Sequence, residues 1–197
     1  DSALIYFNRV IELNPGLAIA YRNRGELLAA QGKLDDAIAD YSRAIESLPD
    51  DAELRRARAH ALQQQDQFEL ARSDLDRSIQ IAPNEAPGYT QRANLFADRC
   101  EYPRAIQDFN QALAIEPKLA DAHRGLAWIK ATCPDERLRD ASQALEAAHA
   151  AVQLSSPDDY LALDVLAAAH ANAGEFDEAI AAQQQAINTA PPEASAP

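Results

Sequence analysis

Apolar and small residues recur along this chain at intervals of three and four, the spacing that places them on one face of an α-helix. Within residues 18–49, a first stretch of this kind carries Ala20, Tyr21, Gly25, Leu28 and Ala29. After a break at residues 31–33, a second stretch carries Ala37, Ile38, Tyr41, Ala44, Ile45 and Leu48. Pro49 follows, and a proline pushes the residue before it out of the helical region. The pattern predicts a helix, a tight turn, a second helix and a proline stop.

The pattern repeats with a period of 34 residues. The prolines Pro15, Pro49, Pro83 and Pro117 keep this step, and so do the alanines Ala3, Ala37, Ala71 and Ala105. Two further columns hold Tyr21, Arg55, Tyr89 and His123, and Val10, Ala44, Ser78 and Ala112. One short period predicts stacked helix pairs, a solenoid without a single closed core. Stacking builds a long wall and no buried pocket, which favours binding over catalysis.

The period predicts one continuous array over residues 1–191. Its units cover residues 1–15, which match only the second half of a repeat, then 18–49, 52–83, 86–117, 120–157 and 159–191. The interval from Pro117 to Pro157 is longer than the period, and the extra residues lie in a predicted loop at 132–138. Residues 192–197 are rich in proline, alanine and serine, and are predicted to be a disordered tail.

One unit resembles the tetratricopeptide repeat in its pattern of Tyr21, Gly25, Leu28, Gly32, Ala37, Tyr41, Ala44 and Pro49. The following units keep the same positions, so the resemblance covers nearly the whole chain. It implies an all-α, right-handed superhelical solenoid of about eleven helices, with about five repeats and an N-terminal half repeat. It also implies a scaffold that binds proteins or peptides, although a fold alone does not define a ligand.

Composition narrows the possible partners. The net charge is −13, and the apolar share of 47% is dominated by alanine. Such a balance argues against binding nucleic acid or an anionic membrane, because both require an excess of Lys and Arg. No apolar run approaches the roughly 18 residues of a spanning helix. The chain begins at Asp1 and contains no methionine, which indicates a piece of a longer protein. Its compartment stays open, with the cytoplasm favoured.

Two cysteines, Cys100 and Cys133, lie almost one period apart. They therefore fall in neighbouring turns, which are usually farther apart than the roughly 7 Å between Cα atoms that a disulfide allows. We expect two free thiols, buried or partly buried, with a disulfide as the less favoured alternative.

Signals of enzyme chemistry are absent from the sequence. The histidines His60, His123, His149 and His170 lack the spacing of a zinc motif, and the glycines form no phosphate-binding loop. Acidic pairs such as Asp35-Asp36 stand at predicted helix starts, where the helix dipole accounts for them. We expect no catalysis, no cofactor and no metal.

Two charged columns vary together. Arg24, Arg58 and Arg92 are each followed 16 residues later by Asp40, Asp74 and Asp108. The last two units lose both columns, with Leu126 and Leu166 in place of the arginine and Ala147 and Ala182 in place of the aspartate. Joint presence and joint loss predict ion pairs, either within a unit or between neighbouring units.

The resemblance implies that the first helix of each unit lines a concave groove. The face opposite the packing residues then carries the candidate binding residues. These are Arg22, Asn23, Glu26, Arg56, His60, Thr90, Gln91, Asn94, Arg124 and Trp128, with Asp164 and Ala168 in the last unit.

A row of arginines, Arg22, Arg56 and Arg124, suits an extended segment that is acidic or ends in a carboxylate. The alternative is a set of solvated arginines satisfied by Glu26, Glu53 and Asp121. The sole tryptophan, Trp128, is either an anchor for a ligand side chain or packs under the loop at 133–138. The exposed His60 is expected to be an ordinary polar residue.

Some members of this family hold a chaperone C-terminus with a clamp of Lys, Asn and Arg on three consecutive first helices. Asn23 fits an asparagine of that clamp, but Ala57 stands where the next cation belongs. We therefore do not expect chaperone-tail binding.

The ends of the array suggest a second function, self-association. Apolar residues at both ends are predicted to lack a covering helix, and solenoids need covered ends. They are Ile180, Ala186 and Ile187 at the C-terminal end, and Leu4, Ile5, Val10 and Ile11 at the N-terminal end.

Overall fold

The protein is all-helical, as the sequence predicts. The computed structural model describes residues 2–191, and over this range it contains eleven α-helices, one short 3-10 helix and no strand. The helices form two compact units that divide between Leu95 and Phe96, and each unit is described by itself.

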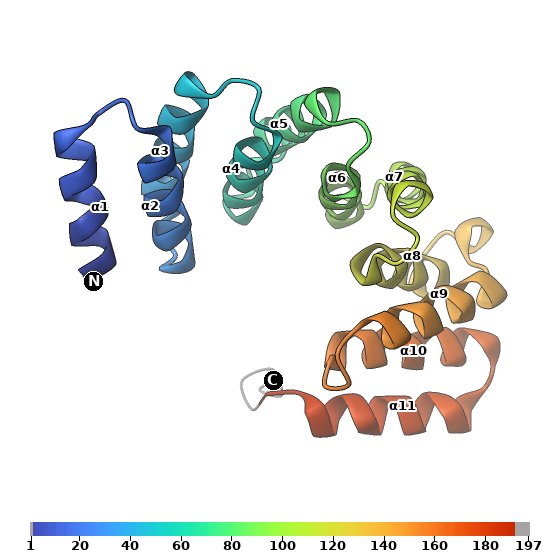
Figure 1. Cartoon of the computed structure of the whole chain (residues 1–197). Coiled ribbons are helices and arrows are strands. Elements are labelled where there is room, and N and C mark those ends of the chain that lie inside the picture. The colour runs from blue at the N-terminus through green and yellow to red at the C-terminus, as the bar shows by residue number, and fades with distance from the viewer. Residues whose placement is uncertain (1, 192–197) are drawn as a thin grey trace. The chain divides into compact units, whose positions relative to one another are not determined.

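Unit 1 contains five complete helices and most of a sixth (Figure 1). They are α1 (Ser2–Leu13), α2 (Ala18–Ala30), α3 (Leu34–Ser47), α4 (Ala52–Gln64), α5 (Phe68–Ile81) and α6 (Ala86–Asp98), whose last three residues belong to unit 2. The helices pack as consecutive pairs, α2 with α3 and α4 with α5. In each pair the first helix is joined to the second by a tight turn.

Unit 2 continues the same alternation (Figure 1). Its helices are α7 (Tyr102–Ile115), α8 (Ala120–Thr132), the 3-10 helix η1 (Glu136–Leu138), α9 (Ala141–Leu154), α10 (Tyr160–Ala173) and α11 (Phe176–Thr189). Here α8 pairs with α9, and α10 pairs with α11. The predicted loop at 132–138 holds η1, which the sequence pattern did not indicate.

Prolines and aspartates set the helix ends. The second helices α3, α5 and α7 each end two residues before a proline, namely Pro49, Pro83 and Pro117. This agrees with the predicted proline stops. At the start of α4, the Asp51 carboxylate accepts a hydrogen bond from the Leu54 amide at 3.0 Å and satisfies a donor that the helix leaves open.

The alanine column holds the paired helices close together. Ala37, Ala71 and Ala105 each have no exposed surface, and Ala144 continues the column in unit 2. Ala3 belongs to the same column but is exposed, because within the described residues α1 has no first helix of its own repeat to pair with and contacts α2 of the next repeat instead. The column therefore marks where two helix backbones meet.

The predicted arginine–aspartate pairs are confirmed twice in unit 1. Two nitrogens of Arg24 donate to the two oxygens of Asp40, and Arg58 grips Asp74 in the same way, all at 2.7 Å. Each pair joins the two helices of one repeat. The third predicted pair, Arg92 with Asp108, spans the boundary between the units and stays a prediction.

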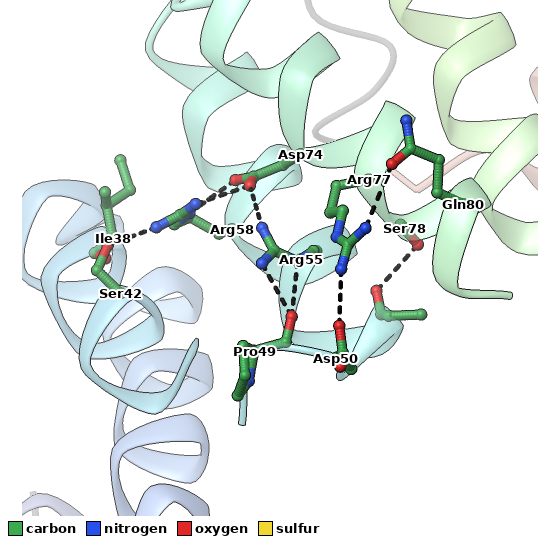
Figure 2. A network of polar contacts seen from close by, with 11 residues as sticks. Ile38, Ser42, Pro49, Asp50, Arg55, Arg58, Asp74, Arg77, Ser78 and Gln80 are labelled. Atoms are coloured by element: carbon green, nitrogen blue, oxygen red, sulfur yellow. Dashed lines mark hydrogen bonds and ion pairs between the residues drawn. The ribbon is translucent and has the colours of Figure 1, made fainter. Parts of the chain in front are cut away.

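The same arginines also reach back to the preceding second helix. Arg24 donates to the Asn8 side chain at 2.7 Å, and Arg58 donates to the Ser42 hydroxyl at 3.0 Å. Arg92 donates to Asp76 at 2.7 Å, from the corresponding position. Figure 2 shows Arg58 between Ser42 and Asp74, so one guanidinium joins three helices.

Arg55, beside this network, ties a first helix to the loop before it. Its guanidinium donates to the Pro49 carbonyl at 2.9 Å and contacts Asp74 at 3.4 Å (Figure 2). The residues at the position of Arg55 in later repeats contact the equivalent carbonyl. The hydroxyl of Tyr89 donates to the Pro83 carbonyl, and the ring of His123 contacts the Pro117 carbonyl. Three different residue types thus make one contact.

In the last repeats apolar packing replaces these pairs. Ala147 is buried in a hydrophobic cluster of unit 2. The other buried members of this cluster are five alanines and Val165, and Leu166 packs against the cluster. The joint loss of arginine and aspartate therefore leaves no buried carboxylate without a partner at this position.

The two cysteines are free, and they lie in different environments. Cys133 is buried immediately after α8, as expected. Cys100 is exposed, and the prediction that both thiols are at least partly buried is wrong for it. The reason is its place at the outer tip of the turn between α6 and α7, where its backbone has a positive φ of 59°.

We predict that enlarging the alanine column destabilises the protein. Ala37→Leu forces extra methyl groups into a closed contact and should lower the free energy of unfolding by about 1–3 kcal/mol. Ala39→Leu, two residues further along α3 and exposed, is the matched control and should change it by less than about 0.5 kcal/mol. Urea unfolding measures both, and equal effects would contradict the assigned contact.

We predict a second effect at the turns inside the repeats. Gly32 and Asp66 occupy equivalent turns at φ of 73° and 57°, a left-handed conformation that is strained for residues with a Cβ. Asp66→Gly should therefore stabilise the protein by up to about 1 kcal/mol, whereas Gly32→Ala should destabilise it by about 1 kcal/mol. A Cβ at Gly32 meets no atom within 4 Å, so a loss there reports backbone strain alone. Thermal unfolding of both variants tests the sign.

Candidate functional site

The candidate groove residues lie on the first helices. In unit 1, Arg22 stands on α2, Arg56 on α4, and Thr90, Gln91 and Asn94 on α6. Glu26, His60 and Asn94 are exposed, whereas Asn23 and Gln91 are partly buried. Thr90 is buried, and its hydroxyl donates to the Ala86 carbonyl of the same helix at 3.1 Å. This leaves Thr90 little surface for a ligand.

Each arginine of the row contacts a carboxylate at the start of the next first helix. Arg22 lies 3.3 Å from Glu53, Arg56 lies 3.4 Å from Glu85, and Arg124 lies 3.6 Å from Asp159. Arg22 also approaches Glu26 at 3.8 Å, and Arg124 contacts Asp121 at 2.8 Å. The sequence indicated Glu26, Glu53 and Asp121 as partners, whereas Glu85 and Asp159 emerge only from the fold.

The two partners in unit 1 hold their arginines weakly. The side chains of Glu53 and Glu85 are 66% and 59% exposed, and each makes a single long contact with its arginine. Ion pairs this exposed contribute about 0–1 kcal/mol. In addition, the buried Nε atom of Arg22 and the buried Oε1 atom of Gln91 have no hydrogen-bond partner. The side chains of Arg22 and Arg56 are themselves only 28% and 15% exposed, so the glutamate is the open member of each pair.

Asp159 is itself fixed more firmly than the two glutamates, although its contact with Arg124 is longer, at 3.6 Å. Burial opposes its ionisation, but hydrogen bonds from Ser155 and from the amides of Ala162 and Leu161, together with the Arg124 charge, outweigh burial. The pKa of Asp159 consequently lies below its usual range. Because this carboxylate also caps α10, it is less free to exchange than Glu53 or Glu85.

A depression of about 700 Å³ lies beside Arg56 in unit 1. It runs from the α3–α4 loop to the end of α5, and Glu53 and Glu85 both line it. Of the arginine row, Arg56 alone lines this hollow, and the carboxylates of Asp50, Asp51, Glu53 and Glu85 line it as well.

Trp128 in unit 2 is half-exposed and lines an apolar depression of about 440 Å³. The floor is made of alanines of α10 and α11, and the walls include Phe176 and Ile180. Trp128 is therefore not enclosed beneath the loop at 133–138, and it lies at a surface formed with α10 and α11. The sequence pattern marked Ile180 as uncovered but did not associate it or Phe176 with Trp128.

The array ends differ from the sequence expectation in detail. Ile180 and Ile187 are exposed as expected, but Ala186 is buried, because it lies on the face of α11 that packs against α10, at the position that Ala44 has in α3. At the other end Ile5 is exposed, whereas Leu4, Val10 and Ile11 are partly buried.

Among residues 2–191, no helix has the length and apolar character needed to cross a membrane. Over the same range, no three His, Cys, Asp or Glu side chains converge in a way that would hold a metal ion.

Comparison with known sequences identifies the family. Family descriptions of the tetratricopeptide repeat match residues 6–39 and 136–195, and a further one, the TPR repeat, matches residues 25–66. The matched residues lie toward both ends of the chain and together make up more than half of it. The chain belongs to the tetratricopeptide repeat family. No curated protein sequence matches it significantly.

Solved structures show the same fold. A tetratricopeptide repeat protein from Parabacteroides merdae superposes with a TM-score of 0.77 at 19% identity, covering 97% of this chain and 73% of that one. YrrB, described as having an unusual peptide-binding site, gives 0.64 at 18% identity, covering 95% and 94%. The first such domain of Spaghetti (RPAP3), bound to the HSP90 peptide SRMEEVD, gives 0.51 at 25% identity, covering 53% and 83%.

We predict that neighbouring arginines on α4 differ sharply in their structural importance. Arg58→Gln leaves the Asp74 carboxylate, which is only 5% exposed, with a weaker partner, and should lower the free energy of unfolding by about 3 kcal/mol. Arg56→Gln removes only a pair with the exposed Glu85 and should cost less than about 1 kcal/mol. Chemical denaturation of both variants measures the contrast, and similar losses would contradict it.

Proposed function

We propose that the protein is a non-catalytic scaffold that binds an extended, acidic segment of a partner protein along its first helices. Arg22 and Arg56 form the core of this site in unit 1, flanked by Asn23, Glu26, His60, Gln91 and Asn94. Arg124 and Trp128 are the corresponding residues of unit 2. The observation that carries this proposal is that the ion-pair partners of Arg22 and Arg56 are exposed glutamates at 3.3 Å or more.

The family and its structural neighbours support peptide binding as the class of function. YrrB is described by its peptide-binding site, and the Spaghetti domain holds a peptide with two glutamates and a terminal aspartate. A guanidinium suits such carboxylates because it can donate two parallel hydrogen bonds. Ala57 occupies the position of a clamp cation, so we propose a different acidic motif from the chaperone tail.

The histidines have structural partners, which supports a scaffold without catalysis. The ring of His123 lies 2.9 Å from the Pro117 carbonyl, and that of His170 lies 2.7 Å from the Glu175 carboxylate. His149 stacks edge-to-face on His170 with ring centroids 5.7 Å apart. His60 is exposed and contacts only Gln64, at 3.4 Å, which fits an ordinary polar residue.

Self-association is the second candidate function. It is favoured by exposed apolar side chains at both ends of the described chain, including Ile5 and Leu13 on α1 and Ile180 and Ile187 on α11. Sedimentation over a range of concentrations distinguishes the two functions, because only self-association makes the mass depend on protein concentration.

The proposed site predicts selective loss of acidic peptides. A library of internal and C-terminal acidic peptides is tested against the wild type and an Arg22→Gln, Arg56→Gln double variant. Each charge-assisted hydrogen bond contributes about 1.5–3 kcal/mol, so binding should weaken more than tenfold. Isothermal titration calorimetry measures the affinities.

The matched control is an Arg9→Gln, Arg43→Gln double variant. These arginines stand on the second helices α1 and α3, are well exposed, and pair only with Glu12 and Glu46 on their own helices. This variant carries the same change in net charge and should bind as the wild type does. Equal losses in both double variants would reduce the effect to general electrostatics and remove the proposed site.

A further inference from the structure

The negative charge of this protein is concentrated at one end. Residues 140–197 contain nine Asp and Glu residues and no Lys or Arg, whereas residues 96–139 contain seven of each kind. The last stretch therefore carries −9 of the net charge of −13. α10 and α11 therefore carry acidic residues and no Lys or Arg of their own, although Arg124 of α8 contacts Asp159 at the start of α10. Such an excess of negative charge attracts cationic partners.

An apolar stripe runs along α11 in this region. Phe176, Ile180 and Ile187 are 66%, 68% and 54% exposed, and Leu161 of α10 is also exposed. Two depressions of about 440 and 420 Å³ lie along the stripe, and Asp164 and Gln183 line both of them. The surface is therefore hollowed as well as apolar, with Trp128 at the edge of the first depression.

The equivalent face of α3 in unit 1 shows what kind of element fits such a stripe. Leu34, Ile38 and Ile45 have the same spacing on α3 as Phe176, Ile180 and Ile187 have on α11. They belong to a core cluster together with residues of α4, which packs across them as a helix of 13 residues.

The covering helix α4 uses a simple pattern. Its residues in this cluster are Leu54, Ala57 and Ala61, at positions i, i+3 and i+7, so one apolar stripe of a helix meets the stripe of α3. We therefore expect the stripe on α11 to fit an amphipathic helix with small and aliphatic residues at this spacing.

The acidic residues around the stripe determine which polar residues the partner helix should carry. Asp164 stands between the two depressions, held by the Gln183 amide at 3.0 Å, and Glu175, Asp177 and Glu178 surround the start of α11. A Lys or Arg side chain beside the apolar stripe can reach Asp164 and lie against the Trp128 ring. An acidic helix would instead meet carboxylates along its length.

We propose that the α10–α11 surface, defined by Trp128, Asp164, Phe176, Ile180 and Ile187, binds a basic amphipathic helix of a partner protein. This surface is independent of the arginine site of unit 1 and has the opposite charge preference. A second α11 is a poor occupant because it brings the same carboxylates face to face. An anionic membrane is repelled for the same reason.

The test uses a 16-residue peptide that forms one apolar stripe when it is helical. Leu or Ala stands at positions i, i+3 and i+7, and Lys or Arg stands at the other positions. One matched peptide replaces every cation by Glu, and another scrambles the basic sequence so that the apolar stripe is lost. Because Trp128 is the only tryptophan, its fluorescence reports occupancy of the surface directly. The basic amphipathic peptide should bind and shift the emission, and neither matched peptide should do so.

Variants locate the binding. A Phe176→Gln, Ile180→Gln double variant should weaken binding at least tenfold, and Asp164→Asn should weaken it two- to fivefold. Leu70→Gln removes a comparably exposed apolar side chain on α5 and should leave the affinity unchanged. The Arg22→Gln, Arg56→Gln variant should also bind the basic peptide normally, which separates this proposal from the arginine site.

Three results would overturn the proposal. The scrambled peptide binding as well as the amphipathic one would reduce the effect to charge alone. Unchanged affinity of the Phe176→Gln, Ile180→Gln variant would place the peptide elsewhere. A wild-type dimer that this double variant dissociates would show that a second copy of the chain occupies the surface.

Discussion

The close approach of paired helices at the alanine column is the constraint on which the rest of the structure depends. At Ala37, Ala71, Ala105 and Ala144 no side-chain atom is left exposed, because the backbones of neighbouring helices leave room for only a methyl group. Protein interiors are packed as densely as organic crystals, so a larger side chain here has nowhere to go. The 34-residue period places Ala37, Ala71 and Ala105 at this same contact in successive repeats.

Polar contacts fix the stacking that the alanines permit. The Arg58 guanidinium joins Asp74 of its own repeat to Ser42 of the preceding one, and Arg24 does the same between Asp40 and Asn8. Toward the C-terminus, alanine and leucine take over these positions, so apolar packing replaces the ion pair there.

Function on this scaffold belongs to the surfaces that stacking leaves open. On α4, Arg56 and Arg58 are two residues apart, yet one faces an exposed glutamate and the other a buried aspartate. A helix turns by about 100° per residue, so two positions separate an arginine that holds a buried carboxylate from one that meets an exposed carboxylate. On α11 the same geometry separates the buried Ala186 from the exposed Ile187. Both proposed binding surfaces follow from this division.

The sequence by itself determined the repeat, the helices, their proline stops, the alanine contact and the pairing of Arg24 and Arg58 with their aspartates. These features depend on spacing within one repeat, which a periodic pattern displays directly. Only the tertiary structure decided that Thr90 is buried, that Glu85 and Asp159 accompany the arginine row, and that Trp128 shares a surface with Phe176 and Ile180. These contacts join residues of different repeats whose side-chain directions depend on how the helices pack, and periodicity carries no information about that.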